Sequence, residues 1–213
     1  MAVIKHKEQR VGMFIDAQNL YHSAKNLYKA RVNFGQVVKD AVAGRHMIRV
    51  IAYVITTESG EEKNFFEALG KLGIETKTKD LQIFWGGAKK ADWDVGLAVD
   101  AIRLAPKLDT VILATGDGDF VPLVEFLQQS EGCQVEVVSF GKSSSSKLKE
   151  VADDFFDLSE NPRKYLLRGG GRPAPRRGFQ NGKNENFDEE KTSLPTQVSR
   201  NEEPDGRGEE RNY

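Results

Sequence analysis

Short apolar segments alternate along the first 160 residues with segments whose apolar residues recur at helical spacing. The apolar run 11–16 ends on Asp16, and the residues after it place Leu20, Ala24 and Leu27 on one side of a helix. A strand followed by a helix is therefore predicted at the start of the chain. The same pattern predicts strands at 47–56, 110–116 and 133–140, an alternating strand or hairpin at 74–86, and helices at 34–43, 60–73, 92–105, 120–129 and 144–152. The segment 155–160 closes the domain.

Strands that alternate with helices predict an α/β fold, a three-layer sandwich with a central, mostly parallel sheet and helices on both faces. The helix predicted at 92–105 is apolar over most of its circumference, which favours a buried place in the middle of the fold. Because the carboxyl ends of parallel strands meet at one edge of a sheet, the loops after them share one crevice, where ligands bind.

Four aspartates fall at positions that lead to this edge. Asp16 ends the first strand, Asp117 and Asp119 follow a later strand in the stretch "TGDGDF", and Asp94 begins a helix. Two carboxylates about 4 Å apart repel each other by roughly 4 kcal/mol at an effective dielectric constant near 20. Hard divalent ions such as Mg²⁺ and Mn²⁺ take oxygen ligands and offset this repulsion, and they support phosphodiester hydrolysis by activating water.

Each aspartate also has a plain structural interpretation. Gly116 and Gly118 flank Asp117 as in a tight turn, Asp119 stands where the N-cap of the following helix belongs, and Asp94 suits a helix amino terminus. For each aspartate taken alone, the structural interpretation explains the residue as well as a metal site does. Taken together the aspartates favour a metal site, because three independent segments bring Asp to the same edge.

Two further aspartates have simpler roles. We interpret Asp92 as the cap of the helix 92–105, and Asp100 as a partner for Arg103 one turn away. The segment 139–148, "SFGKSSSSKL", fits a phosphate contact and a capping turn equally well.

The motifs "IDAQN", "DVGLAVD" and "TGDGDF", in this order, resemble the NYN domain in its LabA-like branch, a relative of the PIN-domain nucleases. The resemblance runs from about Val11 to Glu160 and implies a PIN-like fold. It also implies a metal-dependent ribonuclease that uses Mg²⁺ or Mn²⁺. The metal and catalytic residues would be Asp16, Asp94, Asp117 and Asp119, with Asn19 and Asp100 in support. The alternative is a non-catalytic RNA-binding or regulatory module that keeps the fold.

Composition changes sharply after residue 160. We expect a flexible amino terminus at 1–10, the NYN domain at 11–160, and a disordered tail at 161–213 that is rich in Arg and Gly and then mixed in charge. The formal net charge of −1 argues against binding polyanions by bulk charge and leaves room for local basic patches. The residues that we expect to contact RNA are Lys89, Lys90, Lys142, Arg168, Arg172, Arg176 and Arg177.

The remaining features favour a cytoplasmic protein. The amino terminus shows no long apolar stretch, so neither a signal peptide nor a membrane span is expected. Cys133 is the only cysteine and fits a buried position in a strand. His6, His22 and His46 lack partners at metal-ligand spacing and suit the surface. Trp85 and Trp93 flank a loop suited to base stacking, although core packing is the favoured interpretation of Trp85. The oligomeric state stays open, a homo-oligomer included.

Overall fold

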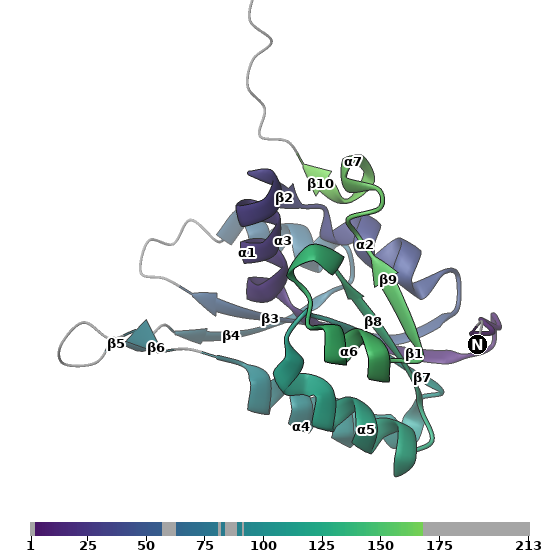
Figure 1. Ribbon diagram of the computed structural model, residues 1–213. Coiled ribbons are helices and arrows are strands. Elements are labelled where there is room, and N and C mark those ends of the chain that lie inside the picture. The colour runs from purple at the N-terminus through teal and green to yellow at the C-terminus, as the bar shows by residue number, and fades with distance from the viewer. Residues whose placement is uncertain (1–2, 57–62, 81, 84–88, 91, 168–213) are drawn as a thin grey trace, which may run out of the picture. The chain divides into compact units, whose positions relative to one another are not determined.

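A sheet of six parallel strands, in the order β4-β3-β1-β7-β8-β9, forms the centre of the fold (Figure 1). The computed structural model describes residues 3–56, 63–80, 82–83, 89–90 and 92–167. All of them belong to one unit of the chain, Met1–Gly171. The strands of the sheet are β1 (Arg10–Asp16), β3 (His46–Thr56), β4 (Glu75–Asp80), β7 (Thr110–Ala114), β8 (Gln134–Ser139) and β9 (Asp154–Asp157).

Helices cover both faces of the sheet, and the two faces have separate cores. Strand β1 shows why: Met13 and Ile15 pack into one cluster with α1, α2 and α3, whereas Phe14 packs into the other with α4, α5 and α6. Figure 1 shows these two helical layers above and below the sheet. The predicted three-layer α/β sandwich is thereby confirmed. The helices are α1 (Ala17–Tyr28), α2 (Phe34–Val42), α3 (Lys63–Lys71), α4 (Asp94–Leu104), α5 (Val121–Gln129) and α6 (Ser146–Val151).

The strand order reverses beside β1. From β1 the chain moves outward through β3 to β4, and it then returns to the opposite side of β1 to add β7, β8 and β9. Ligands of open parallel sheets bind outside the carboxyl ends of the strands at such a reversal. In this chain the reversal lies between β1, which ends on Asp16, and β7, which ends three residues before Asp117.

Helix α4 differs from the sequence prediction. It lies in an outer layer, with Leu97 and Ala101 buried against the sheet, while Val95 is 74% exposed and Val99 46% exposed. The prediction that this helix is buried in the middle of the fold was wrong. Apolar residues lie on two faces of the helix, and the sheet covers only one of these faces.

Described structure continues past the expected domain boundary at residue 160. A short helix, α7 (Pro162–Tyr165), leads into β10 (Leu166–Leu167), which pairs antiparallel with β2 (Arg31–Val32). Tyr165 is buried, and its hydroxyl donates a hydrogen bond to Asp40 Oδ2 at 2.8 Å. Nearly all of the expected tail lies outside the described residues. The other small sheet joins β5 (Gln82–Ile83) to β6 (Lys89–Lys90).

The amino edge of the sheet holds paired charges. Arg45 and Glu136, both buried, form a two-point ion pair, and the Arg45 guanidinium also donates to the backbone oxygens of Ala41 and Val42. Lys5, in the segment expected to be flexible, lies 3.1 Å from Glu136 and 2.8 Å from Asp154. The residues before β1 thus contribute to the charge balance of this edge.

Candidate metal centre

A pocket at the carboxyl edge contains most of the predicted acidic residues. Asp16 enters it from the end of β1, Asp117 from the loop after β7, and Asp94 from the start of α4. Single carboxylate oxygens of Asp94, Asp117 and Asp119 all lie within 4.8 Å of one another, which suits a shared cation. Asp16 lines the same pocket without belonging to this group of three.

Hydrogen bonds fix the position of Asp16, which is partly buried. Its Oδ1 accepts the backbone N–H of Asn19 at 3.0 Å, which caps α1, and its Oδ2 accepts from the Thr115 hydroxyl at 3.3 Å. Burial raises the pKa of the Asp16 carboxyl, and the nearby charge of Asp117 adds to the rise, while these hydrogen bonds oppose it. A cation would favour the ionised form that burial disfavours.

The pKa of Asp94 is also raised. Burial and the neighbouring carboxylates of Asp16 and Asp117 raise the pKa of Asp94 to about 6. Asp94 also lies in the first turn of α4, where a negative charge interacts well with the helix dipole. The dipole therefore offsets only part of the repulsion.

The "TGDGDF" loop is built around Asp117. Asp117, rather than Asp119, is the capping residue: its Oδ1 accepts the backbone N–H of Asp119 at 3.0 Å at the start of a 3₁₀ turn, Gly118–Phe120. Helix α5 follows this turn directly. Capping and metal binding are thus compatible for Asp117, because the cap uses one of its two carboxylate oxygens.

Asn19 and Thr115 connect the two acidic segments. The side-chain oxygen of Asn19 accepts the Gly116 backbone N–H at 2.9 Å, joining α1 to the loop after β7. Thr115 Oγ1 accepts the Asp117 N–H at 3.2 Å and donates to Asp16. This network connects Asp16 at the end of β1 to the loop that carries Asp117.

The serine-rich loop packs directly on the acidic loop. The Ser145 N–H donates to the Gly116 oxygen at 2.9 Å, and a Cβ at Gly116 would lie 2.9 Å from the hydroxyls of Ser139 and Ser144. Ser145 also caps α6. These contacts agree with the capping interpretation of this loop, whose Lys142 is exposed.

Asp100 does not pair with its expected partner, and Asp92 does not have its expected capping role. Asp100 pairs with Lys77 and accepts the Tyr53 hydroxyl hydrogen bond at 2.8 Å, instead of pairing with Arg103. Burial works against ionisation of Asp100, yet the hydrogen bonds from Lys77 and Tyr53 outweigh it and lower its pKa. Asp92 does not cap α4, because the N-cap position is Trp93 and makes no side-chain cap bond.

The pocket also contains residues that sequence reasoning did not assign to it. His22, exposed as expected, lines the pocket together with Tyr53 and Trp93. The position of His22 one helical turn after Asn19 was the available signal. No comparable signal marked Tyr53, which comes from β3. The Trp93 ring lies 5.4 Å from that of Tyr53, and its Nε1–H donates to the Val54 oxygen at 3.0 Å.

Several candidate RNA contacts fall outside what the structure describes. For Lys89 and Lys90 the structure describes only the backbone, which forms strand β6 and pairs with β5. The residues concerned are Lys89, Lys90, Arg168, Arg172, Arg176 and Arg177, together with Trp85.

The fold and the acidic pocket together are those expected of a PIN-like α/β domain. The family model for the NYN domain matches residues 10–159, so the chain belongs to the NYN domain family, as its motifs predicted.

Within the described residues, none of the helices is both long enough and apolar enough to span a membrane.

Two known proteins are similar to this chain, and the first supports the LabA-like assignment. The chain is 25% identical over 181 residues to the low amplitude and bright protein LabA of Synechococcus elongatus, covering 79% of this chain and 93% of that protein. It is 27% identical over 160 residues to the uncharacterized protein MJ0482 of Methanocaldococcus jannaschii. This second match covers 72% of this chain and spans 57% of the relative.

A solved structure has the same fold. It is the crystal structure of VPA0982, a protein of unknown function from Vibrio parahaemolyticus RIMD 2210633. The TM-score is 0.69 at 30% sequence identity, and the match covers 78% of this chain and 100% of that one.

Proposed function

We propose that this protein is a ribonuclease that hydrolyses RNA phosphodiester bonds with Mg²⁺ or Mn²⁺ held by Asp16, Asp94, Asp117 and Asp119. The observation that carries the proposal is the convergence of these carboxylates on the sheet edge where the strand order reverses. Membership of a PIN-like nuclease family points to the same chemistry.

The donor set fits a hard divalent ion. Three of the four carboxylates have oxygens within 4.8 Å of one another. Burial and neighbouring carboxylates raise the pKa values of Asp16 and Asp94, and a divalent cation would offset both effects. When bound there, a divalent ion would lower the pKa of a coordinated water and stabilise the charge that develops on the phosphate.

The chain's own residues have distinct roles in this proposal. Asp16 and Asp117 supply fixed oxygens, since Asn19 and Thr115 hold both in place. Asp94 must lose its proton before it binds a cation, and with a pKa of about 6 it does so below neutral pH. His22, Tyr53 and Trp93 form the rest of the pocket lining and are available to contact the nucleotide.

The arginine-rich segment after residue 167 is proposed to add RNA affinity. Replacing Arg168, Arg172, Arg176 and Arg177 with Gln should reduce the salt dependence of RNA binding. Each lost phosphate contact lowers the log–log slope by about 0.7 for a single strand. An unchanged slope would assign these residues to a linker.

Asp16→Asn tests the catalytic proposal directly. With labelled single-stranded RNA and Mn²⁺, this variant should lose about a hundred- to a thousandfold in kcat/KM, because several kcal/mol of transition-state stabilisation depend on a correctly held ion. RNA affinity should change only a few fold. Cleavage by the parent should stop with chelator and leave 5′-phosphate and 3′-hydroxyl ends.

Asp109→Asn is the matched control, because it makes the same chemical change at the opposite edge of the sheet, where Asp109 pairs with Arg10. It should cleave like the parent. A parent protein that binds RNA but does not cut it with any divalent ion would support the non-catalytic RNA-binding or regulatory alternative. Full activity in Asp16→Asn would place the site elsewhere.

A further inference from the structure

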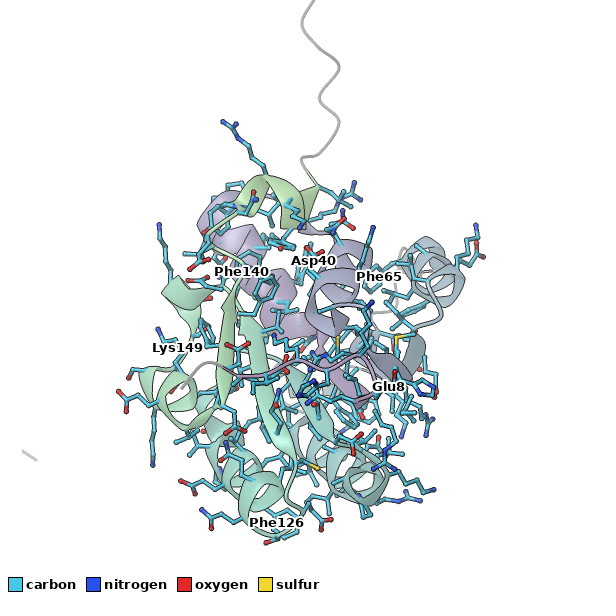
Figure 2. The ribbon with its side chains drawn as sticks, turned by 90° about the vertical axis from the view of Figure 1, so that its right-hand side faces the viewer. Glu8, Asp40, Phe65, Phe126, Phe140 and Lys149 are labelled. Atoms are coloured by element: carbon cyan, nitrogen blue, oxygen red, sulfur yellow. The ribbon has the colours of Figure 1, made fainter. Side chains whose placement is uncertain are left out.

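The outward face of α4 carries apolar side chains that the fold leaves exposed. Val95 is 74% exposed, Val99 46% and Ile102 37%, whereas Leu97 and Ala101 on the opposite face are buried against the sheet. In Figure 1 the helix lies in the outer layer beneath the sheet, next to α5. Phe126 of α5, seen at the lower surface in Figure 2, is 38% exposed as well.

The exposed residues follow the spacing of a helix-pairing seam. Val95, Val99 and Ile102 are separated by four and then three residues, the alternation that places side chains along one line of a helix. We call these three residues the α4 stripe. A continuous stripe of this kind marks an interaction surface more than scattered apolar residues do.

We propose that the α4 stripe is the interface of a homodimer in which α4 packs antiparallel on the α4 of a second copy around a two-fold axis near Val99. The stripe is self-complementary in this direction. Val99 lies close to its midpoint and meets its own counterpart, while Val95 of each copy meets Ile102 of the other.

Charge complementarity favours the antiparallel pair of like helices. Asp92 stands just before α4 and Arg103 lies in its last turn, so the two ends of the helix carry opposite charges. Both side chains are exposed. Antiparallel packing sets Arg103 of each copy beside Asp92 of the other, whereas parallel packing would set like charges together.

The pairing has a consequence for the acidic pocket. Asp92 lines that pocket, and the residues described as lining it include no Lys or Arg. Arg103 from the second copy would therefore bring a guanidinium to the pocket rim. The dimer itself does not depend on the proposed ribonuclease activity.

Site-specific crosslinking tests the orientation. Cys133 is the only cysteine and is buried, so Val99→Cys introduces a single exposed thiol near the two-fold axis. Under mild oxidation at micromolar protein this variant should form a disulfide-linked dimer in high yield. Leu72→Cys is the control, because Leu72 is similarly exposed at 49% and lies outside α4. Equal crosslinking of both variants would overturn the proposal.

Association of the unmodified chain gives the second test. Light scattering over a concentration series should show a dimer for the parent and for Leu72→Glu. Val99→Glu should weaken the dimer more than a hundredfold by placing two carboxylates together, with a circular dichroism spectrum like that of the parent. Arg103→Glu should weaken it a few fold, and adding Asp92→Lys should restore it. A parent that stays monomeric at about 100 μM, or a dimer indifferent to Val99→Glu, would overturn the proposal.

Discussion

The two edges of the central sheet treat acidic residues in opposite ways. At the amino edge, Glu136 binds Arg45 and Lys5, and Asp109 binds Arg10. At the carboxyl edge, Asp94 and Asp117 face each other and Asp16 across a pocket.

The direction of the pKa shifts follows this difference. The hydrogen bonds from Arg10 hold the pKa of Asp109 below its usual value, so the folded state favours the charged form there. Burial and neighbouring carboxylates raise the pKa values of Asp16 and Asp94, so the folded state disfavours their charges. The charge of Asp109 therefore stabilises the fold, whereas the charges of Asp16 and Asp94 oppose it until a cation binds.

The largest expected effect on stability is at the amino edge. Glu136→Leu should lower the free energy of unfolding by about 3–5 kcal/mol, because it leaves the fully buried Arg45 without its counter-ion. Urea denaturation monitored by circular dichroism measures this. The double variant Arg45→Met with Glu136→Leu should recover a good part of the loss, and an equally unstable double variant would contradict the charge argument.

Asp94→Asn should change the free energy of unfolding in the opposite direction. In metal-free buffer at pH 7 we expect the free energy of unfolding to rise by about 1 kcal/mol, since removing the charge relieves repulsion that solvent only partly screens. The response of the melting temperature to millimolar Mn²⁺ should shrink or disappear, because a ligand is lost.

The pH dependence of Asp94→Asn provides its control. The pKa of Asp94 rises from 3.8 to about 6 on folding, so the parent is favoured while this group is protonated and loses that stability as the pH rises through about 6. The advantage of the variant should therefore be larger at pH 8 than at pH 4. An equal advantage at both values would mean that repulsion is not its cause.

Asp109→Asn should have the smallest effect. Its pair with Arg10 is largely exposed, and exposed ion pairs contribute little because solvent and salt screen them. The contribution is present above the normal pKa of Asp109 and is lost as the pH falls. Thermal melts with and without 1 M NaCl should barely separate this variant from the parent. A large loss would show that the amino edge depends on this pair as well as on Glu136.

The sequence predicted the residues that local patterns determine. The run ending on Asp16 became β1, and the apolar strand before Asp117 became β7, as hydrophobic patterning predicts. The convergence of Asp16, Asp94 and Asp117 followed from the general rule for parallel sheets, which needs only the alternation of strands and helices.

Choices between competing partners were not predictable in the same way. Asp100 forms hydrogen bonds with Lys77 and Tyr53 on neighbouring strands instead of pairing with Arg103 on its own helix. These contacts depend on the strand order, which local sequence patterns do not specify. Likewise, Val95 and Leu97 are both apolar, and the sequence alone does not show which face of α4 meets the sheet.

The close packing of the acidic and serine-rich loops limits how these sequences can change. Gly116 has Ser139 and Ser144 where a side chain would begin, and Gly118 has Ser145 in the corresponding place. A methyl group at either glycine would require the facing serine to become smaller or the loop to move. Among related chains, substitutions at these glycines and serines should therefore occur together, and a laboratory search for new specificity should vary the two loops as one library.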